Sequence, residues 1–484
     1  MPFAAYPAPF IRDHPNGAKT QQLIWGDFVQ RLNEDDGDWT KVRSRGQTGW
    51  LKKIEVQDER LLEINFVDIG QGDGAFIVTP AGAFLLIDAG ESDSMFRFLS
   101  WRFNLRDEPG RRIEIPTAVI THSDQDHYKG FSQLFASPQL TFETIFHNGI
   151  VERAGADLLG PRVEHQGGKF LTDLISDLAT LTARLADPAF VGGKQYPKML
   201  KSGLATGRIT DVRAVSASDG FLPGFAPPGD FTIETLGPAR ETIDGQDALR
   251  WFTDDGKTKN GHSVALRMRY RNVRIFFGGD LNIPSAEHLL RHHTGLSPTP
   301  ATAAQADALV AAARPKFEAD VAKACHHGSA DFTEFFLRSL NPLATVISSG
   351  DDEPFAHPRP DALGAYGKFG RGPRPLVFST ELGRSPNENI KDPHKLRADI
   401  ADLFAQREAA APENRPPIQA RIDATLAKLE RSIAVYGLVN LRSDGHKVLL
   451  AQKLERPRAA THEEFDVHLL EPDASGELRY LPKH

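Results

Sequence analysis

The chain has 484 residues, of which 40% are hydrophobic and 25% charged, a composition typical of a globular protein long enough for two or three domains. The formal net charge of -7 argues against strong non-specific binding to nucleic acid, although it leaves room for a local basic groove. The single cysteine, Cys325, excludes an internal disulfide framework and fits a reducing compartment.

The N-terminal residues and the lengths of the apolar runs predict a cytoplasmic protein. Residues 1–7 have neither a basic start nor a long apolar stretch, so they do not form a signal peptide. Apolar runs stay well below the roughly 18 residues that a membrane-spanning helix needs. We therefore expect no membrane partner.

Residues 1–56 look like a separate unit of short alternating strands broken by Gly and Asp turns. Trp39 and Trp50 fit the core of a small barrel better than a platform for a ligand. The pattern W-x-x-V-R followed by G-x-x-G-W resembles a bacterial SH3-like β-barrel. That resemblance implies binding of peptides or cell-wall fragments, or docking on a neighbouring domain, and hence a possible protein partner.

From Leu61 the chain alternates strands and helices, which predicts a layered α/β fold. Residues 150–255 are rich in Gly, Pro and Asp and predict an insertion with one helix near 169–185. Outside the insertion a helix is expected at 92–101, and strands are expected at 62–67, 75–78, 83–87, 117–120, 263–268, 273–277, 321–325 and 344–348.

Residues 385–484 predict a C-terminal extension that packs on the preceding domain. The polar, proline-bearing segment 384–417 predicts a mobile connection. A helix over 418–433 and a β-hairpin over 435–454 are expected to follow, because apolar residues first recur at helical spacing and two β-rich runs then flank an Asp-Gly turn.

The densest group of possible metal ligands follows the expected strand at 117–120. His122, Asp124, Asp126 and His127 form the pattern H-x-D-x-D-H. Charged groups packed this closely at the end of a buried strand need a cation or water, and a cation is the better explanation. Other expected strand ends also carry ligand-type residues, namely Asp88, Asp280, His326, His327 and His357.

The ordered set of motifs over about residues 62–360 resembles the metallo-β-lactamase fold, in its ComEC/Rec2-like branch. The matching pieces are V-D-I-G-Q-G-D at 67–73, L-I-D-A-G at 86–90, T-H-S-D-Q-D-H at 121–127, Asn260 with Ser263, G-D at 279–280, H-H-G-S at 326–329 and H-P at 357–358. The resemblance implies an αββα sandwich over residues 60–384 with a two-metal site at its edge.

The same resemblance implies a role for each matching residue. His122 and Asp124 would bind one metal, Asp126 and His127 the second, and Asp280 would bridge them. His326 is the favoured further ligand of the second metal, and His327 is its alternative or a substrate contact. Asp88 orients the cluster loop, while Asn260 and Ser263 fasten the strand and loop near the site. Asp126 also moves protons, and His357 lies near the leaving group.

Two departures from the general superfamily pattern H-x-H-x-D-H bear on the metal. Asp124 stands where the pattern has its second His, which makes the site harder and suits Mn²⁺ as well as Zn²⁺. A third protein ligand for the first metal is not evident, and the candidates are His147 and His165. The predicted cofactors are therefore two divalent ions, Zn or Mn, with the first held more loosely.

These features favour a metal-dependent hydrolase that uses a bridging hydroxide, with phosphodiester bonds of a nucleic acid or nucleotide as the leading substrate. The alternatives are a hydrolase of a small ester, amide or lactam, and a scaffold or docking component of a multi-protein bacterial system such as one of defence. A purely structural metal site is less favoured, because structural zinc prefers four Cys or His ligands. A metal-free site is also less favoured, because every central ligand type is present. Arg267, Arg269, Arg271 and Arg274 suit a groove for a phosphate backbone and a solvated face equally well.

Overall fold

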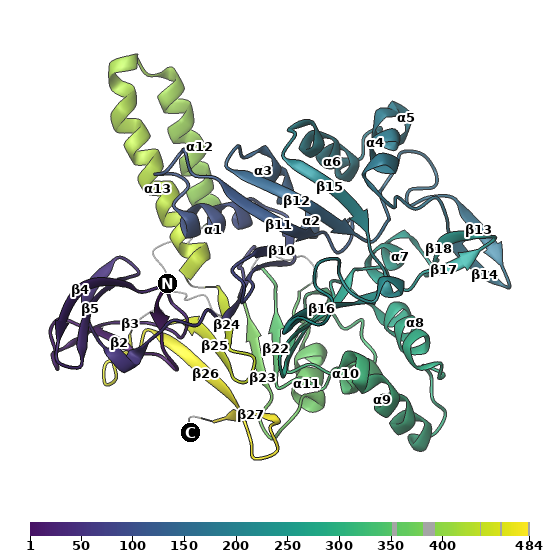
Figure 1. The fold of residues 1–484 in the computed structure, drawn as a ribbon. Coiled ribbons are helices and arrows are strands. Elements are labelled where there is room, and N and C mark those ends of the chain that lie inside the picture. Colours follow the sequence, from purple (N-terminus) through teal and green to yellow (C-terminus); the bar gives the residue numbers. More distant parts are fainter. Residues whose placement is uncertain (351–355, 381–392, 436, 455–456, 483–484) are drawn as a thin grey trace.

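The computed structural model describes residues 1–350, 356–380, 393–435, 437–454 and 457–482 and shows a mixed α/β protein (Figure 1). Two large sheets pack face to face, and helices cover the outer face of each. The mixed α/β class expected from the sequence is confirmed, and each strand predicted between residues 62 and 348 is present within a few residues of its predicted bounds.

The first sheet has ten strands. The four strands at one end run parallel and the others pair antiparallel. In spatial order they are β15 (Ile209–Ala214), β12 (Leu140–His147), β11 (Ile113–Val119), β10 (Phe84–Ala89), β9 (Gly74–Val78), β8 (Leu62–Phe66), β24 (Val439–Ser443), β25 (Val448–Lys453), β26 (Phe465–Pro472) and β27 (Leu478–Leu481).

The second sheet has six strands, and the last four run parallel. In spatial order they are β16 (Phe231–Gly237), β19 (Ala265–Tyr270), β20 (Val273–Phe277), β21 (Val321–Lys323), β22 (Ala344–Ile347) and β23 (Leu376–Ser379). Apolar side chains of both sheets, such as Phe66 and Phe277 with ring centroids 5.7 Å apart, form one core between them. This shared core explains why these strands are apolar along nearly their whole length.

Helices close the two outer faces. The first sheet is covered by α1 (Ser94–Phe103), α3 (Phe131–Ala136), α4 (Leu178–Ala186), α5 (Pro188–Val191) and α6 (Gln195–Ala205). The second is covered by α8 (Ile283–Thr294), α9 (Ala303–Phe317), α10 (Glu334–Leu340) and α11 (Pro360–Phe369). Side-chain caps fix several starts: Asn282 accepts from the backbone of α8, Thr302 from that of α9 and Thr333 from that of α10.

The predicted insertion contributes to both main sheets, through β15 and β16, and builds a smaller sheet of its own at one end of the molecule (Figure 1). That sheet contains β13 (Arg162–His165), β14 (Gly168–Leu171), β18 (Gln246–Arg250) and β17 (Glu241–Ile243). The prediction of one helix near 169–185 was wrong in its start and in the number of helices, because α5 and α6 also lie in the described insertion. Residues 168–171 extend as β14, and the helix α4 begins only after Asp177, whose side chain caps it.

The N-terminal strands form a five-stranded antiparallel sheet and a two-stranded pair; the SH3-like resemblance stays a prediction. They are β1 (Phe3–Ala4), β2 (Phe10–Arg12), β3 (Lys19–Gln22), β4 (Gln30–Asp36), β5 (Trp39–Ser44), β6 (Gln47–Lys52) and β7 (Val56–Gln57). The unit packs on the C-terminal strands, where Trp25 shares an apolar cluster with Leu449 and Phe465. The backbone of Phe465 also donates to Gln22 at 2.9 Å.

The C-terminal region corrects one prediction. The segment 384–417, expected to be a mobile connection, contains the helix α12 (Pro393–Ala409), while 384–392 falls outside the described residues. The predicted helix over 418–433 is present as α13 (Arg415–Val435), and the two form a helical hairpin that projects beside α1 (Figure 1). The predicted β-hairpin is β24 with β25, which joins the first sheet through β8. None of the helices in the described ranges combines the length and apolarity that crossing a membrane requires.

Candidate metal centre

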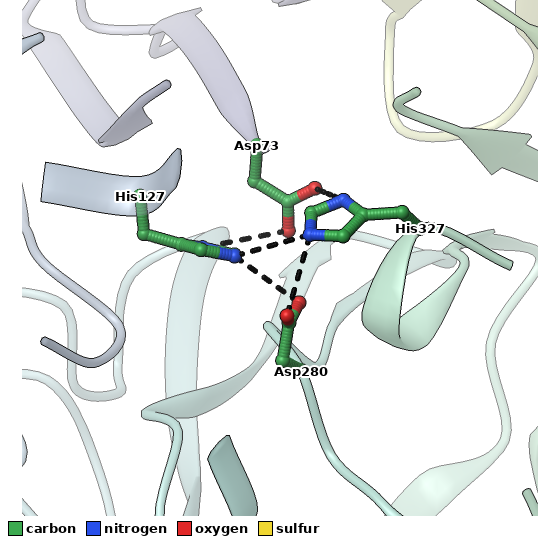
Figure 2. A group of neighbouring side chains, drawn as sticks. All are labelled: Asp73, His127, Asp280 and His327. Carbon is green, nitrogen blue, oxygen red and sulfur yellow. Dashed lines mark hydrogen bonds and ion pairs between the residues drawn. The ribbon is translucent and has the colours of Figure 1, made fainter. Parts of the chain in front are cut away.

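Four buried side chains from distant parts of the chain meet where strands of the two sheets end. Asp73 precedes β9, His127 lies in α2 (Gln125–Tyr128), Asp280 follows β20, and His327 lies in the 3-10 turn after β21. Each offers one ligand atom, and these atoms all lie within 4.8 Å of one another (Figure 2). We call this group the central cluster.

The ring of His127 is oriented by Asp88. Its Nδ1 lies 2.8 Å from Asp88 Oδ2, so that this nitrogen donates to the carboxylate. Its Nε2 points into the central cluster and lies 3.2 Å from Asp280 Oδ1. A nitrogen in this position needs a positive charge between itself and the carboxylate, which either a proton or a metal ion can supply.

The ring of His327 is held in the same way from the other side. Its Nδ1 lies 3.1 Å from Asp73 Oδ1 and 3.1 Å from the carbonyl oxygen of Ser348, both of which can accept its proton. Its Nε2 lies 3.3 Å from Asp280 Oδ2 and 3.3 Å from His127 Nε2. Two imidazole nitrogens therefore face each other across a carboxylate, an arrangement that a shared cation stabilises.

The pKa values point to the same need for positive charge. Burial lowers the pKa of His127, but the carboxylates of Asp280 and Asp88 raise it well above its usual value. Burial likewise lowers the pKa of His327, and Asp280 and Asp73 outweigh that effect and raise it. Burial raises the pKa of Asp280, yet the neighbouring histidines hold it well below its usual range. The centre is thus a buried negative site that a divalent cation fits.

Asp73 lies within ligand distance, and its Oδ1 has no hydrogen-bond partner among the described residues. Oδ1 faces His327, and Oδ2 forms an ion pair with the ammonium group of buried Lys323. Asp73 and Asp88 therefore orient one histidine each, as carboxylates behind metal-bound histidines commonly do. Asp126 brings a further carboxylate to the same histidine, since its Oδ2 lies 3.4 Å from His327 Nε2.

Strained backbone surrounds the cluster. Asp88, His326 and His327 have φ values of 54°, 49° and 54°, in the left-handed region where residues other than Gly cost roughly 1–3 kcal/mol each. Gly72 has a φ of 102°, and a Cβ there would collide with the backbone carbonyl of Asp126. The G-Q-G-D turn can lie against the cluster only because Gly occupies this position.

A second set of predicted ligands lies beside the central cluster. His122 Nε2 is buried, has no hydrogen-bond partner within the described ranges, and lies 3.6 Å from Asp124 Oδ2 and 3.9 Å from Asp280 Oδ2. Its Nδ1 lies 3.3 Å from Ser263 Oγ. With its amide nitrogen facing Asp124, Asn260 donates to Oδ2 at 2.6 Å. All of these predicted residues thus converge on one side of Asp280.

The remaining predicted residues mark the more accessible side of the centre. The side chains of Asp124, Asp126 and His326 are 29%, 18% and 25% exposed, whereas those of the two central histidines are nearly fully buried. His326 Nε2 lies 3.8 Å from Asp280 Oδ2, and the ring of His357 lies 5.6 Å from that of His326. This side of the centre is therefore more exposed than the side of the two central histidines.

Sequence reasoning overlooked part of the centre. Asp73 was recognised within the G-Q-G-D motif but given no role, and Lys323, its buried counterion, was not considered. His327 joins the central cluster, although His326 had been favoured. The signal that could have identified Lys323 is a lysine in an otherwise apolar strand, V-A-K-A at 321–324, because a buried lysine needs a carboxylate partner.

Other sequence candidates lie outside the central cluster. Burial, and then the nearby Arg240, lowers the pKa of His147 to about 3, and the backbone of Gly149 donates to its Nδ1 at 3.3 Å. His165 lies in β13 of the small sheet. Burial raises the pKa of the Cys325 thiol to about 12, which keeps it protonated and unreactive.

The four arginines near β19 and β20 have partners within the protein. Arg267 pairs with Glu234, Arg271 with Asp230 and Glu59, and Arg274 with Glu318 and Asp320. Arg269 donates to the carbonyl of Arg271 at 2.8 Å. Internal ion pairing accounts for most of this positive charge without a nucleic-acid partner.

Comparisons with known proteins do not identify a family for this chain. No protein-family model matches the chain, and a search of curated proteins finds no match. Among solved structures the chain is similar to a mutant of the CmlA beta-hydroxylase, with 12% sequence identity and a TM-score of 0.31. The match covers 67% of this chain and 54% of that one, so the chain spans about half the length of that protein. A likeness this distant carries no conclusion about chemistry.

Proposed function

We propose that the protein is a metal-dependent hydrolase that acts on phosphodiester bonds, as its motif resemblance to the ComEC/Rec2-like branch of metallo-β-lactamase-fold enzymes implies. The observation that carries the proposal is the central cluster, in which two oriented imidazoles and a shared carboxylate bring their ligand atoms within 4.8 Å of one another. The residues present fit a divalent cation, because nitrogen and carboxylate ligands suit both Zn²⁺ and Mn²⁺.

Bound divalent ions would lower the pKa of water and neutralise charge that develops on a substrate oxygen. Asp280 lies between the two ligand sets and can serve both. Asp88 and Asp73 keep His127 and His327 in the tautomer that presents Nε2. The protein therefore holds its ligand atoms in place before substrate arrives, which limits the reorganisation needed during the reaction.

Two residues on the accessible side suit proton handling in this proposal. Burial raises the pKa of the Asp126 carboxyl, but the hydrogen bond with His327 and the charge of His127 outweigh burial and hold this pKa below its usual value. The carboxyl group therefore stays ionised and can orient an attacking water. His357 lies beside His326 at the rim, where it can protonate a leaving oxygen.

Substrate tests can separate this proposal from its closest rival. The metal-loaded protein is incubated with single-stranded DNA, RNA, plasmid and bis-p-nitrophenyl phosphate, and in parallel with p-nitrophenyl acetate and a chromogenic lactam. Cleavage of the phosphodiesters alone supports the proposal, and cleavage of only the ester or lactam moves the function to small acyl substrates.

Substitutions of two predicted ligands test the assignment of the centre. Asp126→Ala and His127→Ala should each abolish turnover, whereas the control Glu91→Gln, which alters an exposed ion pair with Lys129, should leave turnover unchanged. Activity retained in both ligand variants would show that the chemistry occurs elsewhere.

A further inference from the structure

The two ligand sets that share Asp280 differ in how their carboxylates are neutralised. We call the central cluster, with Asp73, His127, Asp280 and His327, the central position, and His122 with Asp124 and Asp280 the lateral position. Among the described residues, the central cluster brings at least three ligand atoms within 4.8 Å of one another, and the lateral position does not form a second group of this kind. It therefore has fewer protein ligands to offer a cation.

Asp124 also has protein partners on both of its oxygens. Oδ1 forms an ion pair with the ammonium group of Lys259, and Oδ2 accepts from Asn260 at 2.6 Å. Lys259 and Asn260 are adjacent in α7 (Asp255–Gly261), whose first turn is capped by Asp254 through a 2.8 Å bond from the Lys257 backbone. Lys259 and Asn260 thus approach Asp124 from the same short helix.

Lys259 is held there as a fixed positive charge. Its side chain is 14% exposed, and its ammonium group lies 3.0 Å from Glu152 Oε1 as well as against Asp124. Two carboxylates therefore hold the ammonium group of Lys259 beside the ligand carboxylate of the lateral position.

We propose that Lys259 makes the two cation positions unequal, so that the central position holds its ion tightly and the lateral position holds an exchangeable one. This inference rests on the proposed function, because it concerns the same centre. The ammonium group competes for the charge of Asp124 and repels a cation on its other oxygen. His122 Nε2, which no described hydrogen bond satisfies, remains available to the ion that enters the lateral position.

The structure sets opposite expectations for two substitutions. Lys259→Met removes the positive charge and leaves Asp124 and Glu152 to attract a cation. Glu152→Gln removes one of the two counterions of Lys259, so that the lysine charge is balanced by Asp124 alone. The first should tighten the lateral position and the second should weaken it, each by about tenfold or more, since a unit charge a few ångströms away changes binding by that order even in a well-screened site.

Metal binding tests this without reference to activity. Metal-free full-length protein is dialysed against graded free Mn²⁺, and bound metal is measured by inductively coupled plasma mass spectrometry. Wild type should take up one ion first and a second only at about tenfold or higher concentration. Lys259→Met should bring the two steps together and Glu152→Gln should separate them further. Lys259→Arg, which keeps the charge, should resemble wild type.

The matched control is Lys257→Met, which removes a more exposed lysine of the same helix that pairs with Asp331. It should leave both binding steps unchanged. Two equal steps in wild type, or unchanged steps in folded Lys259→Met, would overturn the inference while leaving a metal enzyme intact. If Lys259→Met does not fold, an unchanged second step in Glu152→Gln overturns it instead. Absence of any bound ion would overturn the proposed function itself.

Discussion

Replacing Asp88 by Asn should weaken metal binding at the central cluster without unfolding the chain. Asp88 Oδ2 accepts from His127 Nδ1 at 2.8 Å and from Thr121 Oγ1 at 2.7 Å, while Oδ1 accepts from the Thr121 backbone at 2.8 Å. Asn also tolerates the left-handed backbone, here with a φ of 54°. An amide can keep one acceptor oxygen but offers NH₂ in place of the other.

The substitution therefore creates a conflict over the proton of His127. If the amide nitrogen faces Nδ1, that nitrogen must become an acceptor and Nε2 must carry the proton, which turns a metal ligand into a donor. Loss of such an orienting carboxylate typically costs 10–100-fold in metal affinity, or about 1.4–2.7 kcal/mol. Asp88 is fully buried, so solvent cannot replace the lost acceptor.

Competition with a fluorescent chelator measures the effect. Asp88→Asn should lower the affinity for the first-bound ion by about 10–100-fold, and the melting temperature of the metal-free protein indicates whether the fold survives. Glu91→Gln, an exposed substitution nearby in the chain, should change neither quantity. An affinity within about twofold of wild type in a folded Asp88→Asn variant would refute the idea that Asp88 sets the tautomer, because even the low end of the expected loss is tenfold.

Three further predictions concern stability. Lys323→Met should cost about 3–5 kcal/mol in denaturant unfolding, because it leaves the buried Asp73 carboxylate without its counterion; a cost below 1 kcal/mol would contradict this. Gly72→Ala should lower both the melting temperature and metal affinity, since its φ of 102° and the backbone opposite leave no room for a methyl group; unchanged values would show that the turn can move. Burial lowers the pKa of His147 and of His262 to about 3 from a usual 6.5, so the unfolded chain binds more protons between these values. Stability should thus fall as pH drops below about 6.5, by roughly 2 kcal/mol per histidine at pH 5, and replacing either by Gln should flatten the pH profile of unfolding.

The strands could be predicted because they are buried on both faces, which leaves continuous apolar runs such as L-L-I at 85–87. The metal-binding turn could be predicted because its ligands are adjacent in the chain. The start of α4 could not be predicted, since Phe170 and Leu171 extend by pairing with β18, a partner about 80 residues away. Helix α12 was likewise missed because its packing against α13, rather than its own sequence, supports it.

The limits of prediction at the centre have a physical cause as well. Metal ligands can be predicted from sequence because few other roles place His and Asp together in the chain. A counterion can be identified only when the residue that it pairs with in the folded structure is known. Lys259 and Glu152 are 107 positions apart, and each looks like an ordinary surface residue until the fold pairs Lys259 with both Glu152 and Asp124. The charge of a ligand carboxylate is therefore set by residues outside the motif. Two chains with the same H-x-D-x-D-H pattern can therefore hold the ion of the lateral position with different affinities, and Lys259, the residue before Asn260, is the position that would account for the difference.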